Sequence, residues 1–350
     1  MVPVAWAAVS DLTRRFRSTD DATRTTRFDV VGIGNALVDV IAPADESFLT
    51  DFDLVKGAMT LIETERAVEL YAALDRAVEM SGGSAANTVC GIASLGGRAA
   101  YIGKVSGDDL GEVFGHDMRA VGVTFRRPPG DHATPTGRCV IVVTPDAERT
   151  MNTYLGVSSL LCVDDLDEDV IAESSVLYME GYLFDRDDAK AAFRHAAEIA
   201  HANGRMVSLT LSDSFCVDRH RDDFRSLVQD RVDLLFGNHD ELLSLYRLDS
   251  FDDAVNALRD ECEFAAITVG ADGCVVVTPD ELVRVPSVPV ERVIDTTGAG
   301  DLFAAGFLHG LTSGRDLATC GRYGSIAAAE VISHVGPRPL VELRTLIDDA

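Results

Sequence analysis

Short apolar runs alternate with longer amphipathic stretches along most of the chain. The apolar runs are rich in Val and Ile, and they predict β-strands at residues 28–34, 99–105, 176–179, 206–211, 232–236 and 264–269. Helical spacing of apolar residues predicts helices at residues 85–95, 110–121, 187–203, 239–246 and 251–262. Apolar strands that are separated by helices predict a parallel sheet covered on both faces. Ligands of such a sheet bind at the carboxyl ends of its strands.

Two segments, residues 41–62 and 124–155, interrupt this alternation. They lack long helical periodicity and contain β-branched or alternating stretches. We expect them to form a few strands outside the main sheet, as a lid over its ligand-binding edge. The expected organisation is a disordered extension at residues 1–27, one domain at residues 28–340 and a tail at residues 341–350.

Composition and charge exclude several classes of function. The 350 residues, 47% of them hydrophobic, are enough for one large core. A net charge of −26 repels the nucleic-acid backbone and anionic membranes, and no apolar run is long enough to span a bilayer. Seven scattered cysteines without a Cys-x-x-Cys pair are typical of free thiols in a reducing compartment. We therefore expect a cytoplasmic protein that binds a small molecule, and neither nucleic acid nor membrane.

The segment 295–301, Asp-Thr-Thr-Gly-Ala-Gly-Asp, leads directly into an apolar helix pattern. Gly298, Ala299 and Gly300 lack bulky side chains, so their backbone N–H groups could converge on a phosphate at the positive end of that helix. Asp301 would lie in the first helical turn, beside whatever attacks the phosphate. An isolated Gly-Ala-Gly is more often a capped turn. The preceding Asp295 and two threonines favour the phosphate site here.

A second glycine cluster, Gly82-Gly83, opens the helix that follows it, and Asn87 in that helix could donate to a substrate hydroxyl. A tight loop with a helix cap explains this cluster equally well. Asp39 comes just after a buried strand and could accept hydrogen bonds from two vicinal hydroxyls, or cap a turn. Residues 32–39 begin like a dinucleotide fingerprint, but Leu37 stands where the third glycine belongs, which disfavours a dehydrogenase.

Two weaker motifs follow later strands. Asn238 and Glu241 lie within one turn of each other, where an amide and a carboxylate can hold a hydrated magnesium ion. The same spacing makes a helix capping box, which is the commoner reason for it. Residues 268–273 are a strand followed by a glycine turn, which a nucleotide could approach closely, although such turns are common.

Taken in order, these motifs resemble the PfkB, or ribokinase-like, family of carbohydrate and nucleoside kinases, over about residues 28–340. Stretches at residues 34–39, 134–137, 211–215 and 232–238 are similar to adenosine kinases within that family. The resemblance implies an α/β fold of three layers, α/β/α, with a central, mostly parallel sheet and a small β lid. It also implies transfer of the γ-phosphate of ATP, with Mg²⁺, to the primary hydroxyl of a nucleoside. Adenosine is the first choice, and the products would be AMP and ADP.

The resemblance assigns roles to individual residues. Asp301 would be the general base and the backbone at Gly298, Ala299 and Gly300 the anion hole, with Arg149 over the transferring phosphate. The residues that would hold the acceptor are Asp39, Gly82, Gly83 and Asn87 for the sugar hydroxyls and Phe215 for a purine. The residues that would contact ATP and its ions are Asn238, Thr268, Gly270 and Gly273 for ATP, Asn238 and Glu241 for the magnesium waters, and Asp295, Thr297 and the Gly336 region for a monovalent cation such as K⁺.

The choice of acceptor stays open at this level. Residues 182–184, Tyr-Leu-Phe, depart from the pair of phenylalanines of adenosine kinases. Glu180 places a charge near the pocket, either to bind a ring N–H or to pair with an arginine. The alternatives are a sugar kinase of the same family, acting on ribose, fructose or a related sugar, and a non-catalytic nucleotide- or sugar-binding module. The lid segments are long enough for either a monomer or a homodimer.

Overall fold

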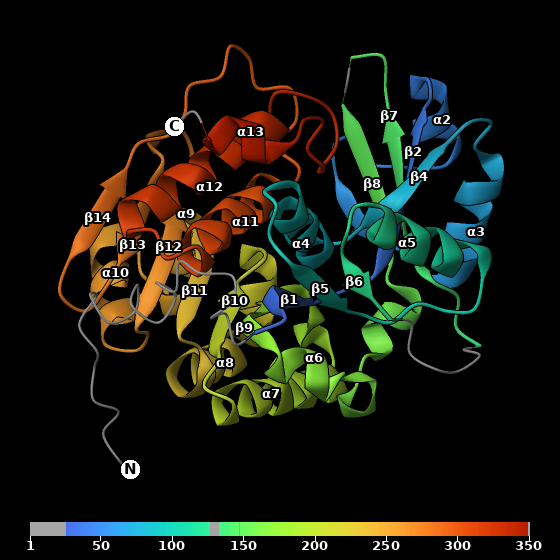
Figure 1. Cartoon of the computed structure of the whole chain (residues 1–350). Coiled ribbons are helices and arrows are strands. Elements are labelled where there is room, and N and C mark those ends of the chain that lie inside the picture. The colour runs from blue at the N-terminus through green and yellow to red at the C-terminus, as the bar shows by residue number, and fades with distance from the viewer. Residues whose placement is uncertain (1–25, 127–132, 147, 349–350) are drawn as a thin grey trace.

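The structure, a computed structural model, describes residues 26–126, 133–146 and 148–348. A nine-stranded sheet with helices on both faces forms most of the molecule, and a five-stranded sheet stands beside it (Figure 1). The expected extension at residues 1–27 lies outside the described residues except for its last two. The same holds for residues 127–132 and 147 of the second expected lid segment.

The nine-stranded sheet has the order β14-β13-β12-β11-β10-β9-β1-β5-β6. Its strands are β1 (Phe28–Ile33), β5 (Ala99–Ile102), β6 (Thr124–Phe125), β9 (Ser174–Glu180), β10 (Met206–Thr210), β11 (Leu234–Asn238), β12 (Phe264–Thr268), β13 (Cys274–Val277) and β14 (Leu282–Val285). The run from β6 to β12 is parallel, and β13 and β14 continue it as an antiparallel edge. All six predicted strands are confirmed in this sheet, with different ends.

The helices form a layer on each face of this sheet, which confirms the predicted α/β/α class. One layer, with its own hydrophobic core, consists of α4 (Ser84–Ser94), α5 (Asp109–Ala120), α11 (Ala299–Thr312), α12 (Leu317–Val331) and α13 (Leu343–Ile347). The other layer and core contain α6 (Glu168–Ala172), α7 (Asp187–Ala202), α8 (Ser214–Arg231), α9 (His239–Tyr246) and α10 (Phe251–Arg259). Helix α13 falls within the expected C-terminal tail; Leu343 and Ile347 are buried, so these residues belong to the folded domain.

The smaller sheet has the order β3-β8-β7-β2-β4 and carries α2 (Glu46–Asp51) and α3 (Thr64–Ala73). Its strands are β2 (Leu37–Pro43), β3 (Met59–Leu61), β4 (Val78–Gly82), β7 (Gly137–Val143) and β8 (Arg149–Tyr154). The expected boundaries of the lid segments were wrong in three respects. Strand β2 begins at Leu37, before the first expected segment. Strand β4 lies outside both expected segments because it pairs antiparallel with β2, and residues 124–125 pair with β5 in the main sheet.

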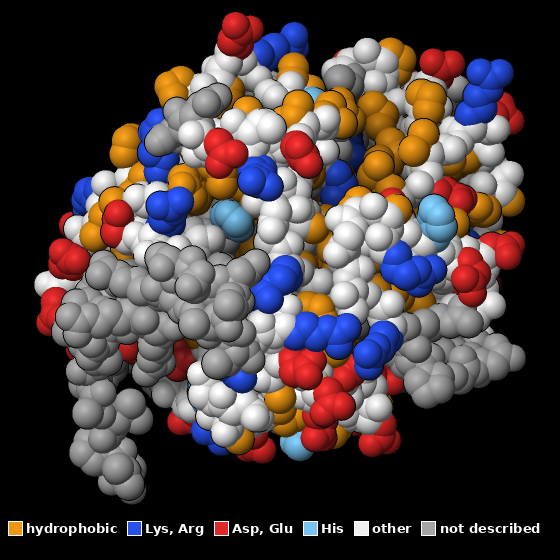
Figure 2. All heavy atoms as spheres, viewed as in Figure 1, with side chains coloured by type: hydrophobic (Ala, Val, Ile, Leu, Met, Phe, Trp, Pro, Cys, Tyr) orange, Lys and Arg blue, Asp and Glu red, His pale blue; other side chains and the backbone are white. Residues whose placement is uncertain are grey.

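The remaining short elements are the 3₁₀ turns η2 (Gly156–Leu160), η3 (Val163–Asp165), η4 (Gly181–Asp185) and η5 (Gly270–Asp272). Lys, Arg, Asp and Glu side chains are interspersed over the visible face of the molecule (Figure 2). Among the described residues, no helix is both long enough and apolar enough to cross a bilayer. All seven cysteines are described and unpaired.

Helices α4 and α11 approach each other closely, and this contact positions the candidate site. Helix α11 is buried on nearly every side, as its almost continuous apolar sequence predicts. Gly91 of α4 faces α11, where an added Cβ would lie only 2.6 Å from the Cβ of Ala305. Gly306 packs against the backbone of Tyr323 in α12 in the same way. The lack of a side chain at Gly91 therefore lets α4 and α11 pack closely.

Candidate active site

Asp301 lies in the first turn of α11 and is bound by α4. Ser84 Oγ donates to its carboxylate at 2.6 Å and Asn87 Nδ2 at 2.9 Å. Desolvation raises the pKa of Asp301, while these two hydrogen bonds and the charge of Arg338 oppose the rise. The amide oxygen of Asn87, Oδ1, is buried and has no partner among the described residues. A substrate hydroxyl placed there could donate a hydrogen bond to the amide oxygen of Asn87. It would then lie beside the carboxylate of Asp301.

The predicted anion hole forms the N-terminus of the same helix. Gly298 is the N-cap with φ of 80°, and an added Cβ would lie 2.9 Å from Pro337, so both backbone and space require glycine. A Cβ at Gly300 would meet no described atom within 4 Å. The N–H of Ala299 donates to the carbonyl of Thr296 at 3.2 Å. In this structure the open part of the turn is therefore at Gly300.

The acceptor side is completed by Asp39, Gly82 and Gly83. Asp39 lies in β2 and not beyond a strand of the main sheet, and its carboxylate faces Gly82, where an added Cβ would lie 2.5 Å from it. Burial raises the pKa of Asp39 to about 6; the charges of Arg338 and Arg149 limit this rise and that of Asp301 adds to it. Gly83 adopts φ of 99° as the N-cap of α4.

Glu180 and Asn35 form a buried network below this turn. Glu180 accepts hydrogen bonds from Ala85 N at 2.8 Å, Asn35 Nδ2 at 3.1 Å and Asn35 N at 3.3 Å. Burial raises the pKa of Glu180 to about 7 against these hydrogen bonds. The expected alternative of an arginine partner is wrong for the described residues, because backbone and amide groups fill its place. Ser158 Oγ donates to the side-chain amide oxygen of Asn35, Oδ1, at 3.0 Å.

Arg149 in β8 connects the smaller sheet to the phosphate side of the site. Its Nη1 donates to the carboxylate of Asp295 and, at 3.1 Å, to Thr297 Oγ1. Its Nε and Nη2 are buried and have no partner among the described residues. A guanidinium with two free N–H donors in a fixed fork fits a phosphate oxygen.

The carboxylate of Asp295 is already saturated. Besides Arg149 it accepts from Thr297 N at 2.9 Å, Thr297 Oγ1 at 2.7 Å and Gly336 N at 2.9 Å. These hydrogen bonds and Arg149 lower the pKa of Asp295 in spite of its partial burial. A carboxylate has roughly four lone-pair sites, so as arranged here Asp295 and Thr297 do not fit a monovalent cation.

Asn238 and Glu241 form the capping box that their spacing also allowed. Glu241 N donates to Asn238 Oδ1 at 2.9 Å, and Asn238 N donates to Glu241 at 2.9 Å. Burial raises the pKa of Glu241 to about 7, against the hydrogen bond from the backbone of Asn238. Among the described residues, no group of three His, Cys, Asp or Glu side chains could hold a metal. In this structure Asn238 and Glu241 cap α9, and their role in holding a hydrated magnesium ion stays a prediction.

The remaining residues predicted to contact ATP or the purine of the acceptor lie at the end of β12 and after strands β10 and β12. Thr268 ends β12, and an added Cβ at Gly270 would meet no described atom within 4 Å. A Cβ at Gly273 would instead lie 2.1 Å from the carbonyl oxygen of Val285, so this glycine serves the fold. Phe215, in the first turn of α8, is 76% exposed and stacks on no described ring.

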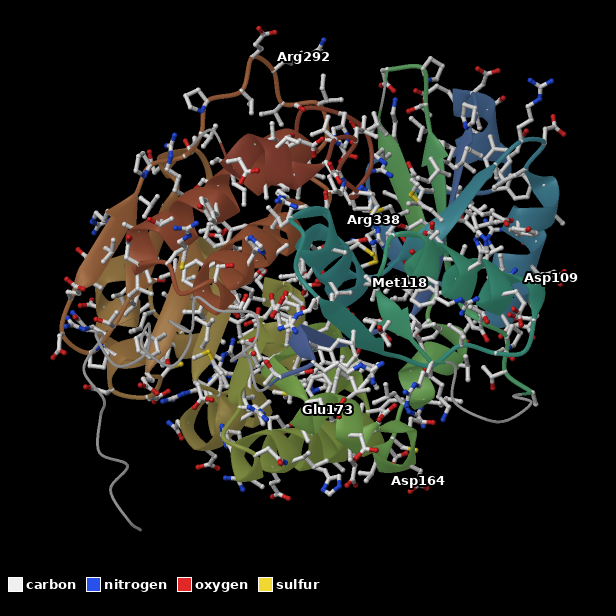
Figure 3. All side chains as sticks on the ribbon, viewed as in Figure 1. Asp109, Met118, Asp164, Glu173, Arg292 and Arg338 are labelled. Carbon is white, nitrogen blue, oxygen red and sulfur yellow. The ribbon has the colours of Figure 1, made fainter. Side chains whose placement is uncertain are left out.

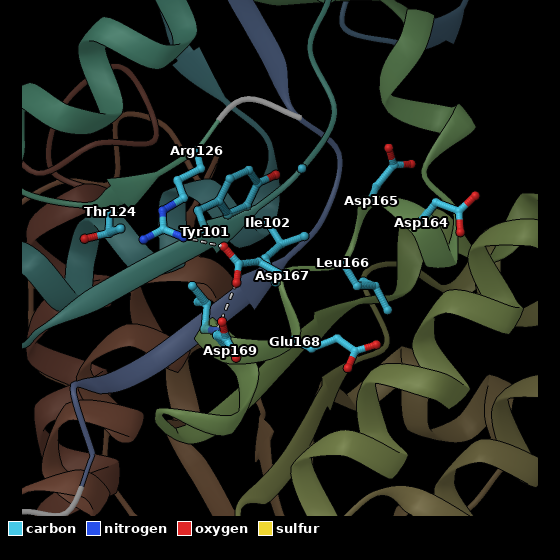
Figure 4. Close-up of a pocket in the computed structure, with 12 residues that line it drawn as sticks. Tyr101, Ile102, Thr124, Arg126, Asp164, Asp165, Leu166, Asp167, Glu168 and Asp169 are labelled. Carbon is cyan, nitrogen blue, oxygen red and sulfur yellow. Dashed lines mark hydrogen bonds and ion pairs between the residues drawn. The ribbon is translucent and has the colours of Figure 1, made fainter. Parts of the chain in front are cut away.

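A pocket of about 540 Å³ lies apart from all these residues (Figure 4). Its walls are the ends of β5 and β6 together with residues 164–170, and Arg126 pairs across it with Asp167 at 3.1 Å. It contains none of the predicted site residues. We assign the site to the α4–α11 contact, because the carboxylate of Asp301, its two partners on α4 and the N-terminus of α11 meet there.

Three residues of the candidate site were missed by sequence reasoning: Asn35, Ser84 and Arg338. Ser84 directly follows the glycine pair, which is a signal that could have identified it. Asn35 and Arg338 carry no such signal, because their partners are 145 and 257 positions away.

The chain is similar to known kinases over most of its length. The model of the pfkB family carbohydrate kinases matches residues 51–343. Adenosine kinase 1 of Arabidopsis thaliana is 27% identical, over 88% of this chain and 94% of that protein.

Two solved bacterial structures are more similar. Adenosine kinase from Sinorhizobium meliloti is 53% identical, with a TM-score of 0.85, over 92% of this chain and 99% of that one. A probable sugar kinase from Rhizobium etli CFN 42 is 48% identical, also with a TM-score of 0.85, over 93% and 98%. Since family, fold and motifs agree, this chain belongs to the PfkB family of carbohydrate kinases, phosphotransferases that use an alcohol group as acceptor.

Proposed function

We propose that this kinase transfers the γ-phosphate of ATP to the primary hydroxyl of a nucleoside, with adenosine as the first choice and AMP and ADP as products. The observation that carries this proposal is the position of Asp301, a carboxylate at the N-terminus of a long helix beside the open backbone at Gly300. The Sinorhizobium meliloti adenosine kinase, at 53% identity, supports the choice of acceptor.

The chemistry requires positioning and charge neutralisation more than covalent help. The acceptor hydroxyl gives its proton to Asp301 while its oxygen attacks the γ-phosphorus, and the bond from that phosphorus to the bridging oxygen of ADP breaks. Asp39 and the free amide oxygen of Asn87 accept hydrogen bonds from the other sugar hydroxyls. The two free donors of Arg149 and the N-terminus of α11 bind phosphate oxygens. A magnesium ion, held through water by Asn238 and Glu241, would supply further neutralising charge when bound.

A sugar acceptor is the second candidate, and one observation favours it. Phe215, expected to hold a purine, is 76% exposed and forms no wall of a closed pocket in this structure. The Rhizobium etli relative, at 48% identity, is described as a probable sugar kinase. Ribose or fructose would use the same base, anion hole and hydroxyl-binding residues without an aromatic partner.

A coupled ADP-release assay with adenosine, inosine, ribose and fructose separates these readings. We expect the highest kcat/KM with adenosine. Each rate is corrected for the ADP that the enzyme releases from ATP without an acceptor. Higher kcat/KM with ribose or fructose would establish the sugar kinase instead. Tight calorimetric binding of adenosine without ADP release from any acceptor would mean that the chain is a binding module.

A further inference from the structure

Arg338 binds both ends of the turn that carries the acceptor site. It belongs to the loop between α12 and α13, and in Figure 3 it lies where α4 meets the smaller sheet. Its Nη2 donates to the carbonyl oxygen of Ser81 at 2.7 Å and to Ser81 Oγ at 2.9 Å. Its Nη1 donates to the carbonyl oxygen of Ala86 at 3.2 Å. One planar guanidinium thus joins the end of strand β4 to the first turn of helix α4.

The segment between these two anchors contains Gly82 and Gly83, two of the residues expected to hold the acceptor, and it ends just before Asn87. Residues 82–85 leave the smaller sheet and enter α4 through the left-handed backbone of Gly83, with φ of 99°. Ser84 then donates to Asp301, and the N–H of Ala85 donates to Glu180. A shift of this segment would move Asn87 relative to the general base.

Ser81 is also held from the opposite side. Asp117 of α5 accepts hydrogen bonds from Ser81 N at 2.8 Å and from Ser81 Oγ at 2.5 Å. Arg338 and Asp117, which belong to different elements, therefore both form hydrogen bonds with Ser81. The turn is fixed by side chains from two distant parts of the sequence, in addition to its own backbone bonds.

The charge of Arg338 also acts on the site. It lowers the pKa of Asp39 and of Asp301, against the desolvation that raises both. On the phosphate side, Arg149 is already paired with Asp295. Arg338 therefore acts on both buried acids, whereas Arg149 acts on Asp39 as well as pairing with Asp295.

We propose that Arg338 is a positioning residue for the acceptor: it clamps residues 81–86 so that Asn87 and Asp301 meet the acceptor hydroxyls in a reactive arrangement. This inference rests on the proposed kinase function of the same site. A lysine could not replace it, because a point charge cannot join two backbone carbonyls as the planar fork does.

The test compares Arg338→Gln and Arg338→Lys with Arg344→Gln. Arg344 lies on α13, in the same C-terminal segment, but its side chain is 66% exposed and pairs only loosely with Asp348, at 3.8 Å. The measurements are kcat, KM for acceptor, KM for ATP, calorimetric affinity for the acceptor and the melting temperature. For Arg338→Gln we expect kcat/KM for the acceptor to fall by about 10²-fold, with KM for ATP nearly unchanged. Arg338→Lys should keep most of the defect, and Arg344→Gln should behave like the unaltered enzyme.

Three results would overturn the inference: an unchanged kcat/KM for the acceptor in Arg338→Gln, an equal rise of KM for ATP and acceptor, or full rescue by lysine. If Arg338→Gln fails to fold, the lysine variant supplies the same comparison of acceptor and ATP. Failure of the function itself would look different, since the unaltered enzyme would then phosphorylate no hydroxyl acceptor. A fully active enzyme with an unaffected Arg338→Gln variant would reject only the positioning role.

Discussion

The two sides of the candidate site differ in how far the protein completes them. On the acceptor side, added Cβ atoms at Gly34 and Gly83 would lie within 2.2 Å of Glu180 Oε2 and Asn35 O, respectively. On the phosphate side, a Cβ at Gly300 or Gly270 would meet no described atom within 4 Å, and Arg149 keeps two donors without described partners.

The difference separates two kinds of binding. The acceptor side is preorganised, because its carboxylates and amides are already fixed by hydrogen bonds within the protein. The phosphate side offers donors and space that an anionic ligand would complete. We therefore expect substitutions on the acceptor side to change the geometry of reaction, and substitutions on the phosphate side to act mainly once phosphate is present.

Asp301→Asn tests the junction of the two sides and should have the largest effect. Asparagine keeps the size of the side chain but cannot accept the hydroxyl proton, so kcat should fall by roughly 10³-fold or more while ATP binding and the melting temperature are kept. Asp252→Asn, an exposed change on α10, is the matched control. Measurable turnover near the unaltered rate would remove Asp301 from the role of base.

Gly300→Ala tests the openness of the phosphate side. The added methyl group meets no described atom, and alanine is the better helix former by roughly 0.5–1 kcal/mol, so the free protein should be slightly more stable. The methyl group would intrude on a bound phosphate, and kcat/KM should fall by about 10²-fold.

Gly115→Ala on α5 is the control for this change, because its added Cβ would lie nearest to the flexible end of Arg119, at 3.1 Å, and would meet the Phe125 ring at an ordinary contact distance of 3.6 Å. Melting curves for both variants measure the change in stability, and steady-state rates measure the change in kcat/KM. Full activity in a stabilised Gly300→Ala enzyme would mean that phosphate does not approach this turn.

The same contrast explains how much the sequence could predict. Strands and helices with a strong period were predicted well, because Val- and Ile-rich runs and amphipathic spacing are local signals. Helix α8 was missed because most of its residues are charged or polar and its backbone is non-helical at His220. Helix α12 was missed because its small residues, Ala and Gly, show little amphipathic contrast.

In the site, glycine-rich turns were visible in the sequence because only glycine permits their backbone or space. Asp301 and Asn87 were found through such turns, and the structure joins them by a hydrogen bond of 2.9 Å. The clamp by Arg338 was invisible, since its residues are brought together only by the complete fold. The pairing of Arg149 with Asp295 was unexpected as well, although each residue had been assigned to the phosphate side.

The pH dependence of stability tests whether the buried carboxyl groups of the acceptor side are shielded from water. Burial raises the pKa of Glu180 from 4.5 to about 7, so between these values the folded state holds more protons than the unfolded state. Stability should therefore fall as the pH rises from 5 to 8. Asp39 and Glu241 add to this trend, with pKa values raised to about 6 and about 7, whereas the lowered pKa of Asp295 acts only at more acidic pH.

Glu180→Gln should flatten this dependence, changing the difference in melting temperature between pH 5 and pH 8 by about 2 °C or more. Glu65→Gln, an exposed change on α3, should leave the slope of the unaltered protein. Equal slopes in all three proteins would show that water reaches Glu180, and that the acceptor side is less closed than the structure has it.

The smallest effect is expected from the monovalent cation. Because Asp295 receives four hydrogen bonds, one of them from Arg149, a potassium ion would have to displace a guanidinium that is held in place by Thr297 as well. Replacing K⁺ by Na⁺ or tetramethylammonium at constant ionic strength should therefore change kcat/KM by less than about 2-fold, a difference of under roughly 0.4 kcal/mol. A strong K⁺ requirement would mean that Arg149 leaves Asp295 during turnover, and that the phosphate side rearranges while the acceptor side stays fixed. The Arg149→Met variant would then distinguish the two arrangements, since K⁺ could bind Asp295 in it without competition.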